Sequence, residues 1–165
     1  MTNIFISYNP KVQAEQSLAL RMQTLGALYG LSISLPDRVG VIGLKETTKQ
    51  RIQRASLFIV FATRNLSRDV VREINYALEL AKTIIVVYDK DVKNNLNIKG
   101  VHEIEYNQKT DSPEKIIKEI NKIISNSKTK VQKSKADNDD DDTIGAFLLI
   151  GLGLLLLGAL TSKSK

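Results

Sequence analysis

The stretch that decides the fold is SLFIVFATRNLSRDVVREINYALELAKTIIVVYD, residues 56–89. It begins with a near-continuous apolar run at 56–63 and ends with a second one at 83–89. Such runs are typical of strands that are buried on both faces, as in parallel sheets. Residues 67–82 between them have apolar side chains at helical spacing, and Ser67 is a good N-cap. Strand, helix and strand in this order predict a parallel β-α-β unit.

The same alternation extends in both directions from this unit. Further strands are predicted at 3–8, 31–36 and, as a weaker edge candidate, 101–107, and further helices at 13–30, 44–55 and 112–125. The pattern predicts an α/β domain over residues 1–125, a flavodoxin-like open parallel five-stranded sheet with helices on both faces. Ligands of such sheets bind at the carboxyl ends of the strands, near a switch in strand order.

The last forty residues have a different composition. Residues 126–142 contain four lysines and five aspartates and almost nothing apolar, which predicts a charged disordered linker. Residues 143–160 carry no charge, and as a helix they would span about 27 Å. We expect them to form a single-pass C-terminal transmembrane helix, with a short tail at 161–165 and the globular domain in the cytoplasm. A helix buried in an oligomer is the alternative.

Composition limits the chemistry that the chain can perform. It has no cysteine and one histidine, His102, so thiolate sites and multi-histidine zinc sites are excluded. If the chain is an enzyme, its catalytic group is therefore expected to be a carboxylate. The net charge of +6 suits a phosphorylated small molecule or anionic lipid, or merely solubility. No nucleic-acid module is recognisable, and we expect no nucleic-acid partner.

Glu73 is the carboxylate whose position needs an explanation. In helix 67–82 the spacing predicts a core-facing stripe of Val71, Ile74, Leu78 and Ala81, and Glu73 lies at its margin. It is either a solvated surface residue or the carboxylate of an active site. No GxGxxG follows a strand, and GVIGLKE at 40–46 lacks the P-loop spacing, so a dehydrogenase or NTPase is not expected.

Three segments together resemble the Toll/interleukin-receptor (TIR) family. IFISYNP at 4–10 resembles the first strand of that family, and LPDRVGVIG at 35–43 its second strand and glycine-bearing loop. SLFIVFATRNLSRDVVREINYAL at 56–78 is similar to the central strand, serine-containing loop and glutamate-bearing helix of these domains. The resemblance covers residues 3–125. Many TIR domains cleave NAD at the nicotinamide–ribose bond, often as self-associated assemblies.

The resemblance implies that Glu73 is the catalytic residue. Cleavage passes through an oxocarbenium-like transition state, which one carboxylate can stabilise without a metal or a cofactor, so NAD+ would be a substrate only. The resemblance further implies that Tyr8 and Asn9 line the nucleotide cleft and that Asp37 and Arg38 begin a loop over the substrate.

Two further positions on the helix bear on the site. Arg72, beside Glu73, is expected to meet a phosphate of the substrate. Asp69 stands where many catalytic TIR domains have an aromatic residue, four positions before the glutamate. A carboxylate one turn away either raises the pKa of Glu73 or faces solvent.

Three functions remain open from the sequence. The first is a membrane-anchored NAD+ nucleosidase, hydrolase or ADP-ribosyl cyclase, that acts in immune or cell-death signalling. The second is a TIR module without activity that assembles with other TIR domains. The third is an enzyme similar to nucleoside deoxyribosyltransferases, which also place a glutamate against a ribose.

Overall fold

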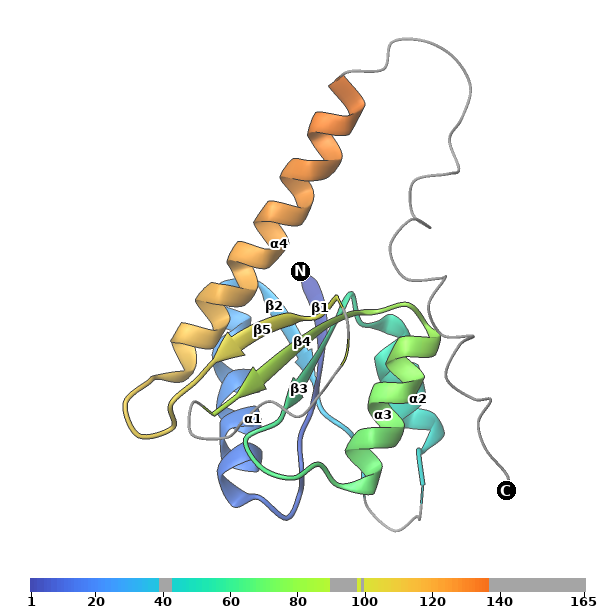
Figure 1. Cartoon of the computed structure of the whole chain (residues 1–165), viewed down its shortest axis with the longest axis vertical. Coiled ribbons are helices and arrows are strands. Elements are labelled where there is room, and N and C mark those ends of the chain that lie inside the picture. Colours follow the sequence, from blue (N-terminus) through green and yellow to red (C-terminus); the bar gives the residue numbers. More distant parts are fainter. Residues whose placement is uncertain (39–42, 90–97, 99, 137–165) are drawn as a thin grey trace, which may run out of the picture. The chain divides into compact units, whose positions relative to one another are not determined.

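The computed structural model describes residues 1–38, 43–89, 98 and 100–136 (Figure 1). Helices separate the first four strands, and a last helix follows the fifth strand. The elements are β1 Thr2–Ser7, α1 Gln13–Gly26, the 3-10 turn η1 Ala27–Tyr29, β2 Leu31–Ser34, α2 Glu46–Arg54, β3 Leu57–Phe61, α3 Arg68–Glu79, β4 Thr83–Tyr88, β5 His102–Glu105 and α4 Pro113–Ala136. All the predicted strands and helices of residues 1–125 are present.

The five strands form one parallel sheet in the order β2-β1-β3-β4-β5. The chain first steps from β1 to β2 on one side, and then returns past β1 to place β3 on its other side. The strand order therefore switches between β1 and β3, where the carboxyl ends of the two strands leave a position for a ligand. β5 lies at an edge of the sheet, as predicted.

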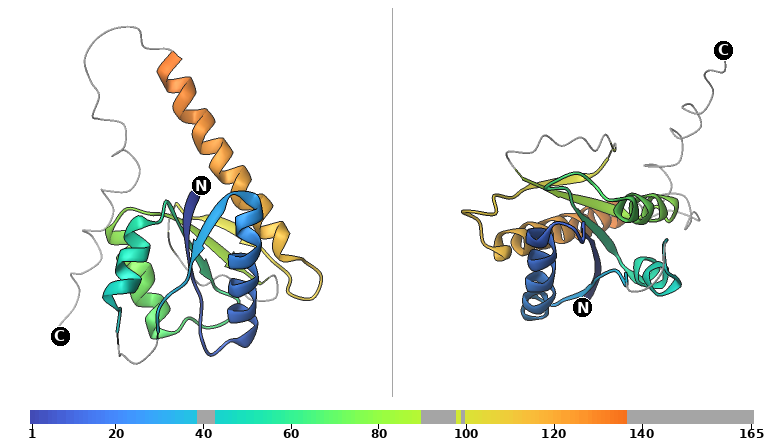
Figure 2. Two further views of the ribbon diagram at one scale, coloured as in Figure 1. Left: turned by 180° about the vertical axis from the view of Figure 1, so that it is seen from behind. Right: turned by 90° about the horizontal axis from the view of Figure 1, so that it is seen from below.

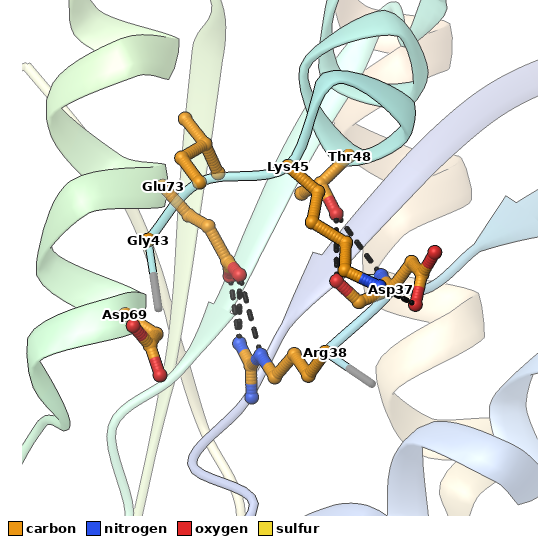
Figure 3. Close-up of a pocket in the computed structure, with 8 residues that line it drawn as sticks. Asp37, Arg38, Gly43, Lys45, Thr48, Asp69 and Glu73 are labelled. Carbon is orange, nitrogen blue, oxygen red and sulfur yellow. Dashed lines mark hydrogen bonds and ion pairs between the residues drawn. The ribbon is translucent and has the colours of Figure 1, made fainter. Parts of the chain in front are cut away.

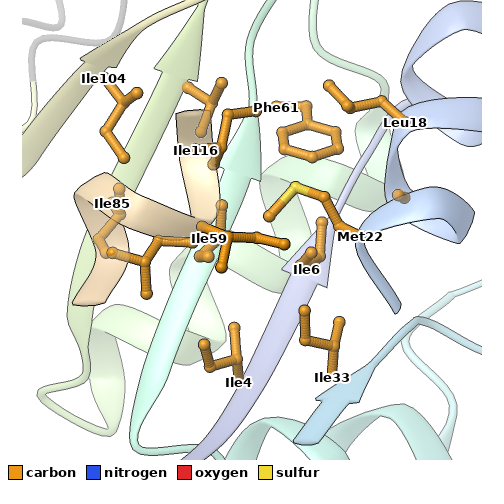
Figure 4. Packing of buried hydrophobic residues seen from close by; sticks show 14 of the residues in the cluster. Ile4, Ile6, Leu18, Met22, Ile33, Ile59, Phe61, Ile85, Ile104 and Ile116 are labelled. Carbon is orange, nitrogen blue, oxygen red and sulfur yellow. The ribbon is translucent and has the colours of Figure 1, made fainter. Parts of the chain in front are cut away.

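Helices cover both faces of the sheet, which confirms the predicted architecture (Figure 2). On one face α1 and α4 pack against side chains such as Ile6, Ile59 and Ile85 (Figure 4). On the other face α2 and α3 pack against residues that include Phe5 and Phe58, whose rings stack at a centroid distance of 5.6 Å. Successive strand side chains point to opposite faces, so the three central strands β1, β3 and β4 contribute to both cores, whereas the edge strands β2 and β5 contribute buried residues to the α1 and α4 side only.

The buried face of α3 differs from the predicted stripe by a rotation of the helix. Val70, Ile74 and Ala77 are buried, whereas Val71 is 42% exposed. Adjacent valines permit two stripes with the same spacing, and the packing of α3 against the sheet selects the one that begins at Val70. Ala81, predicted to face the core, is exposed beyond the helix end. As a result Glu73 lies on the buried face.

The closing helix α4 begins at Pro113, and its Ile116 and Ile120 are fully buried. It continues to Ala136, beyond the helix end predicted at residue 125, so residues 126–136 of the predicted linker are helical. Lys, Gln and Ala in this stretch favour a helix, and no Gly or Pro interrupts it. The chain divides into one compact unit over Met1–Asn126 and another over Ser127–Lys165.

The transmembrane prediction for 143–160 falls outside the described residues, as does the rest of the predicted linker. In the part of the chain that the structure describes, no helix combines the length and the apolar character needed to cross a membrane.

Candidate functional site

Glu73 lies in the second turn of α3 and is held beside the carboxyl end of β1. The helix start is defined by Ser67, whose side chain caps it by accepting a hydrogen bond of 3.3 Å from the Val70 N–H, as predicted. The rotation of α3 turns Glu73 inward, and only 2% of the residue is exposed. The interpretation of Glu73 as a solvated surface residue is therefore wrong. A buried carboxylate needs partners that compensate its lost hydration.

Two side chains, Ser7 and Arg38, supply those partners, and Figure 3 shows the contact of Arg38 with Glu73. Ser7, the last residue of β1, donates a hydrogen bond from its hydroxyl to Oε2 of Glu73. Arg38 places its guanidinium across the carboxylate, with Nη2 at 2.9 Å from Oε1 and 2.8 Å from Oε2, and Nε at 3.3 Å from Oε1. A carboxylate offers about four lone-pair positions, so these contacts use its accepting capacity.

The environment of Glu73 changes its acidity. Burial raises the pKa of Glu73, and this effect exceeds the lowering by the positive charge of Arg38 and by the hydrogen bonds from Ser7 and Arg38. The charge of Asp69, one turn earlier, raises the pKa of Glu73 by a smaller amount. Asp69 also faces solvent in part, with 44% of its side chain exposed. Both of the effects expected from Asp69 are therefore present. A carboxyl group with a raised pKa in a cleft is a candidate catalytic group.

Arg38 contacts the backbone and ring of Tyr8 as well as Glu73. Its third nitrogen, Nη1, donates to the carbonyl oxygen of Tyr8, and the guanidinium carbon lies 4.9 Å from the centroid of the Tyr8 ring. The side chain of Arg38 is 16% exposed. Arg38 therefore contacts both Glu73 and Tyr8, and all three are among the six residues predicted for the site.

Asp37 organises the chain that leads into the site. Its carboxylate accepts from Lys45 Nζ at 3.0 Å and from the Thr47 hydroxyl at 3.2 Å. Its backbone N–H donates to the Thr48 hydroxyl at 3.0 Å. These contacts fasten the segment before Arg38 to the start of α2. Asp37 lines the same pocket as Glu73, with its carboxylate engaged by these neighbours.

The side chains of Asn9 and Arg72 lie outside the pocket that contains Glu73. The Asn9 side chain ties two loops together: Nδ2 donates to the Asn65 carbonyl at 2.9 Å, and Oδ1 accepts from the Lys11 N–H at 3.0 Å. Arg72 is 46% exposed and pairs with Asp69 at 3.2 Å on the outer side of α3.

The structure contains a second buried carboxylate, Glu15, which was not predicted from the sequence. It is 1% exposed and accepts from the Asn9 N–H at 2.7 Å, the Thr63 N–H at 3.1 Å and the Thr63 hydroxyl at 2.7 Å. Glu15 therefore joins the loops after β1 and β3 at the switch in strand order. Burial raises the pKa of Glu15, against the opposing effect of these hydrogen bonds.

Neither Glu15 nor Ser7 was predicted to belong to the site, but the sequence contains a periodic signal that both are buried. Glu15 stands three, four and seven positions before Leu18, Ala19 and Met22, which are the buried residues of α1. Ser7 stands two positions after Phe5 and so faces the α2 and α3 layer in which Glu73 lies. Alternation in β1 and helical spacing in α1 identify the buried positions, although not the partners.

The pocket beside Glu73 is small. Its lining residues include Arg38, Lys45, Thr48 and Asp69. Its volume is about 20 Å³. That is room for about one water molecule. Among the described residues, no group of three or more His, Cys, Asp and Glu side chains is arranged to hold a metal ion. The pocket is lined by the carboxylates of Asp37, Asp69 and Glu73 and by the cations of Arg38 and Lys45, and of these carboxylates Glu73 is the buried one.

No protein-family model matches the chain, and no curated protein matches it. Among solved structures, the chain is similar to the CMP N-glycosidase BcmB of Clostridium botulinum, with a TM-score of 0.49 and 18% sequence identity. The alignment covers 72% of this chain and 97% of that chain.

Proposed function

We propose that the chain is a TIR-type enzyme that cleaves the bond between nicotinamide and ribose in NAD+. One observation carries the proposal: the buried carboxylate of Glu73 lies near the end of β1, beside the strand-order switch, fixed by Ser7 and Arg38. Parallel sheets bind ligands at this place. A single oriented carboxylate is the group that cleavage of a ribosyl–nicotinamide bond requires.

The reaction can be written with this one carboxylate. The bond between ribose C1′ and the nicotinamide nitrogen breaks, and both electrons leave with nicotinamide, which departs neutral. The ribose then carries positive charge, shared between C1′ and the ring oxygen, and the Glu73 carboxylate stabilises it. Water adds to C1′ and one proton is released, which gives ADP-ribose. If a nucleophile of the same molecule replaces water, the product is cyclic.

Burial strengthens this role of Glu73. Outside water, a negative charge interacts more strongly with the positive charge that develops on the ribose. Two fixed contacts to the carboxylate keep its oxygens in place before the substrate arrives. Such preorganised charge is a major source of enzymatic rate enhancement. The proposal includes self-association of the TIR domain and anchoring by residues 143–160, which would gather several copies on a membrane.

The test is release of nicotinamide from NAD+ by the full chain, compared with two variants. Glu73→Gln keeps the shape and removes the charge, and we expect release to fall by about 100-fold or more. Glu79→Gln removes a charge from the exposed end of the same helix, so it serves as the matched control. Product analysis then separates hydrolysis from cyclisation.

Two results would favour the other functions. No release from any folded, self-associated form would favour the assembly module, and Glu73 would then be a structural carboxylate. Transfer of a sugar from a nucleoside to a free base, without cleavage of NAD+, would favour the deoxyribosyltransferase-like enzyme.

A further inference from the structure

The position of Arg38 constrains any ligand that would use Glu73. All the accepting positions on the carboxylate are taken, one by Ser7 and the others by the Arg38 guanidinium. A ribose that binds Glu73 must present hydroxyl donors to the same oxygens. The small volume left in the pocket does not accommodate a sugar beside the guanidinium. Arg38 must therefore withdraw from Glu73 when a riboside binds.

The charge of the reacting sugar points to the same exchange. A ribose that loses its base becomes positively charged, and a guanidinium on the same carboxylate would repel it. The sugar would take over the neutralising role that Arg38 has in the ligand-free protein. The withdrawn guanidinium then needs a new anion, because a partly buried cation without a partner is unfavourable.

The contacts of Arg38 allow a short movement without loss of its anchor. Nη1 is held by the Tyr8 carbonyl, and the guanidinium lies over the Tyr8 ring, independently of Glu73. Rotation about these contacts would free Nε and Nη2. Two parallel N–H groups of a guanidinium match two oxygens of a phosphate, and this bidentate pairing is the preferred way for arginine to bind phosphate.

Resting on the proposed function, we propose that Arg38 selects 5′-phosphorylated ribosides, exchanging the Glu73 carboxylate for the 5′-phosphate of the substrate. The phosphate draws the guanidinium away, and the ribose takes the vacated positions on Glu73. An unphosphorylated nucleoside offers no anion to Arg38 and would have to displace it without compensation. The substrate class is therefore nucleotides that carry a 5′-phosphate, with nucleosides strongly disfavoured.

A binding measurement tests this inference without catalysis. The full chain is titrated with ribose 5-phosphate and with ribose, and the dissociation constants are compared. We expect ribose 5-phosphate to bind at least about 10-fold more tightly than ribose, as hydrogen bonds to a charged group imply. Arg38→Gln should abolish this preference. Arg54→Gln, which removes a charge at the exposed far end of α2, should retain it.

Arg38→Lys is a second variant, in case Arg38→Gln unfolds when Glu73 loses its partner. Lysine keeps a positive charge near Glu73 but has no planar pair of donors, so the preference for ribose 5-phosphate should fall while the fold is retained. Equal affinities of the wild type for the two sugars would overturn the proposal. So would an undiminished preference in a folded Arg38→Gln or Arg38→Lys variant, or no binding of ribose 5-phosphate at all.

A turnover measurement separates failure of this inference from failure of the proposed function. Nicotinamide release is compared for nicotinamide mononucleotide and nicotinamide riboside, which differ by the 5′-phosphate. The ratio of their kcat/KM values should fall by at least about 10-fold in Arg38→Gln. An unchanged ratio, with release still dependent on Glu73, would overturn the role of Arg38 alone. Release that is absent or unaffected by Glu73→Gln would overturn the proposed function, and the binding titration would still decide the role of Arg38.

Discussion

At the scale of single residues, the central feature is a carboxylate whose neighbours set its charge. Burial disfavours the ionised form of Glu73, whereas Arg38 and Ser7 favour it, and the pKa of Glu73 remains above that of an exposed glutamate. The proposed reaction requires the ionised form of Glu73. Activity should therefore be lost on acidification at a higher pH than an exposed glutamate would give, and be regained as the pH rises through the pKa of Glu73.

Ser7→Ala tests how the hydroxyl positions the carboxylate. The substitution removes a hydrogen bond that lowers the pKa of Glu73, so the pKa should rise and the acidic limb of the pH profile should move to higher pH. Loss of one hydrogen bond to a charged group should also lower kcat by about 10-fold. The measurement is nicotinamide release between about pH 4 and pH 9.

Ser7→Thr is the control for this experiment, because it keeps the hydroxyl. An alanine variant whose profile overlays that of the wild type would remove Ser7 from the positioning of Glu73. A profile that keeps its shape and is merely lower would indicate a structural role.

At the scale of elements, two loops at the end of the sheet are joined by α1. Glu15, in the first turn of α1, accepts the N–H of Asn9 after β1 and both donors of Thr63 after β3. Asn9 also reaches Asn65 directly, at 2.9 Å. These contacts fasten the strand ends beside which Glu73 is placed, so the geometry of the site depends on α1 although α1 covers the opposite face.

Glu15→Ala should therefore destabilise the fold. It leaves three donors without their acceptor in a buried place, and each such group costs about 1–3 kcal/mol when water does not replace the partner. Allowing for water that enters, we expect a loss of about 2–4 kcal/mol in the free energy of unfolding. Urea denaturation measures it.

Glu79→Ala, at the exposed end of α3, should change the free energy of unfolding by less than about 0.5 kcal/mol. If the two substitutions had equal effects on stability, the Glu15 contacts would not hold the loops together.

At the scale of the full chain, the proposed anchoring by residues 143–160 can be tested through its effect on activity. A membrane anchor confines copies of the domain to a surface and raises their effective concentration. Where active sites need self-association, deletion of 143–165 should lower activity strongly at low protein concentration and weakly at high concentration. To measure this difference, nicotinamide release is followed over a series of protein concentrations for the full chain in lipid vesicles and for the chain that lacks 143–165. Equal loss at every concentration would argue against the concentrating role.

Much of the architecture followed from local patterns. The apolar runs at 56–63 and 83–89 correctly predicted β3 and β4, and Ser67 marked the start of α3. Gly30, the last residue of the predicted helix 13–30, adopts a left-handed backbone with φ of 73° that suits glycine. Such signals can be read because they depend on neighbours within one or two turns of the chain.

Local sequence patterns alone predicted the α/β alternation and the parallel sheet, and they singled out Glu73 as a carboxylate in an unusual position. The tertiary structure decided the strand order, the rotation that buries Glu73, and its partners. Ser7 and Arg38 lie 66 and 35 positions from Glu73 in the chain. Periodicity shows that a side chain is buried but not what it meets, because contacts between distant segments arise only when strand order and helix rotation have been set by packing.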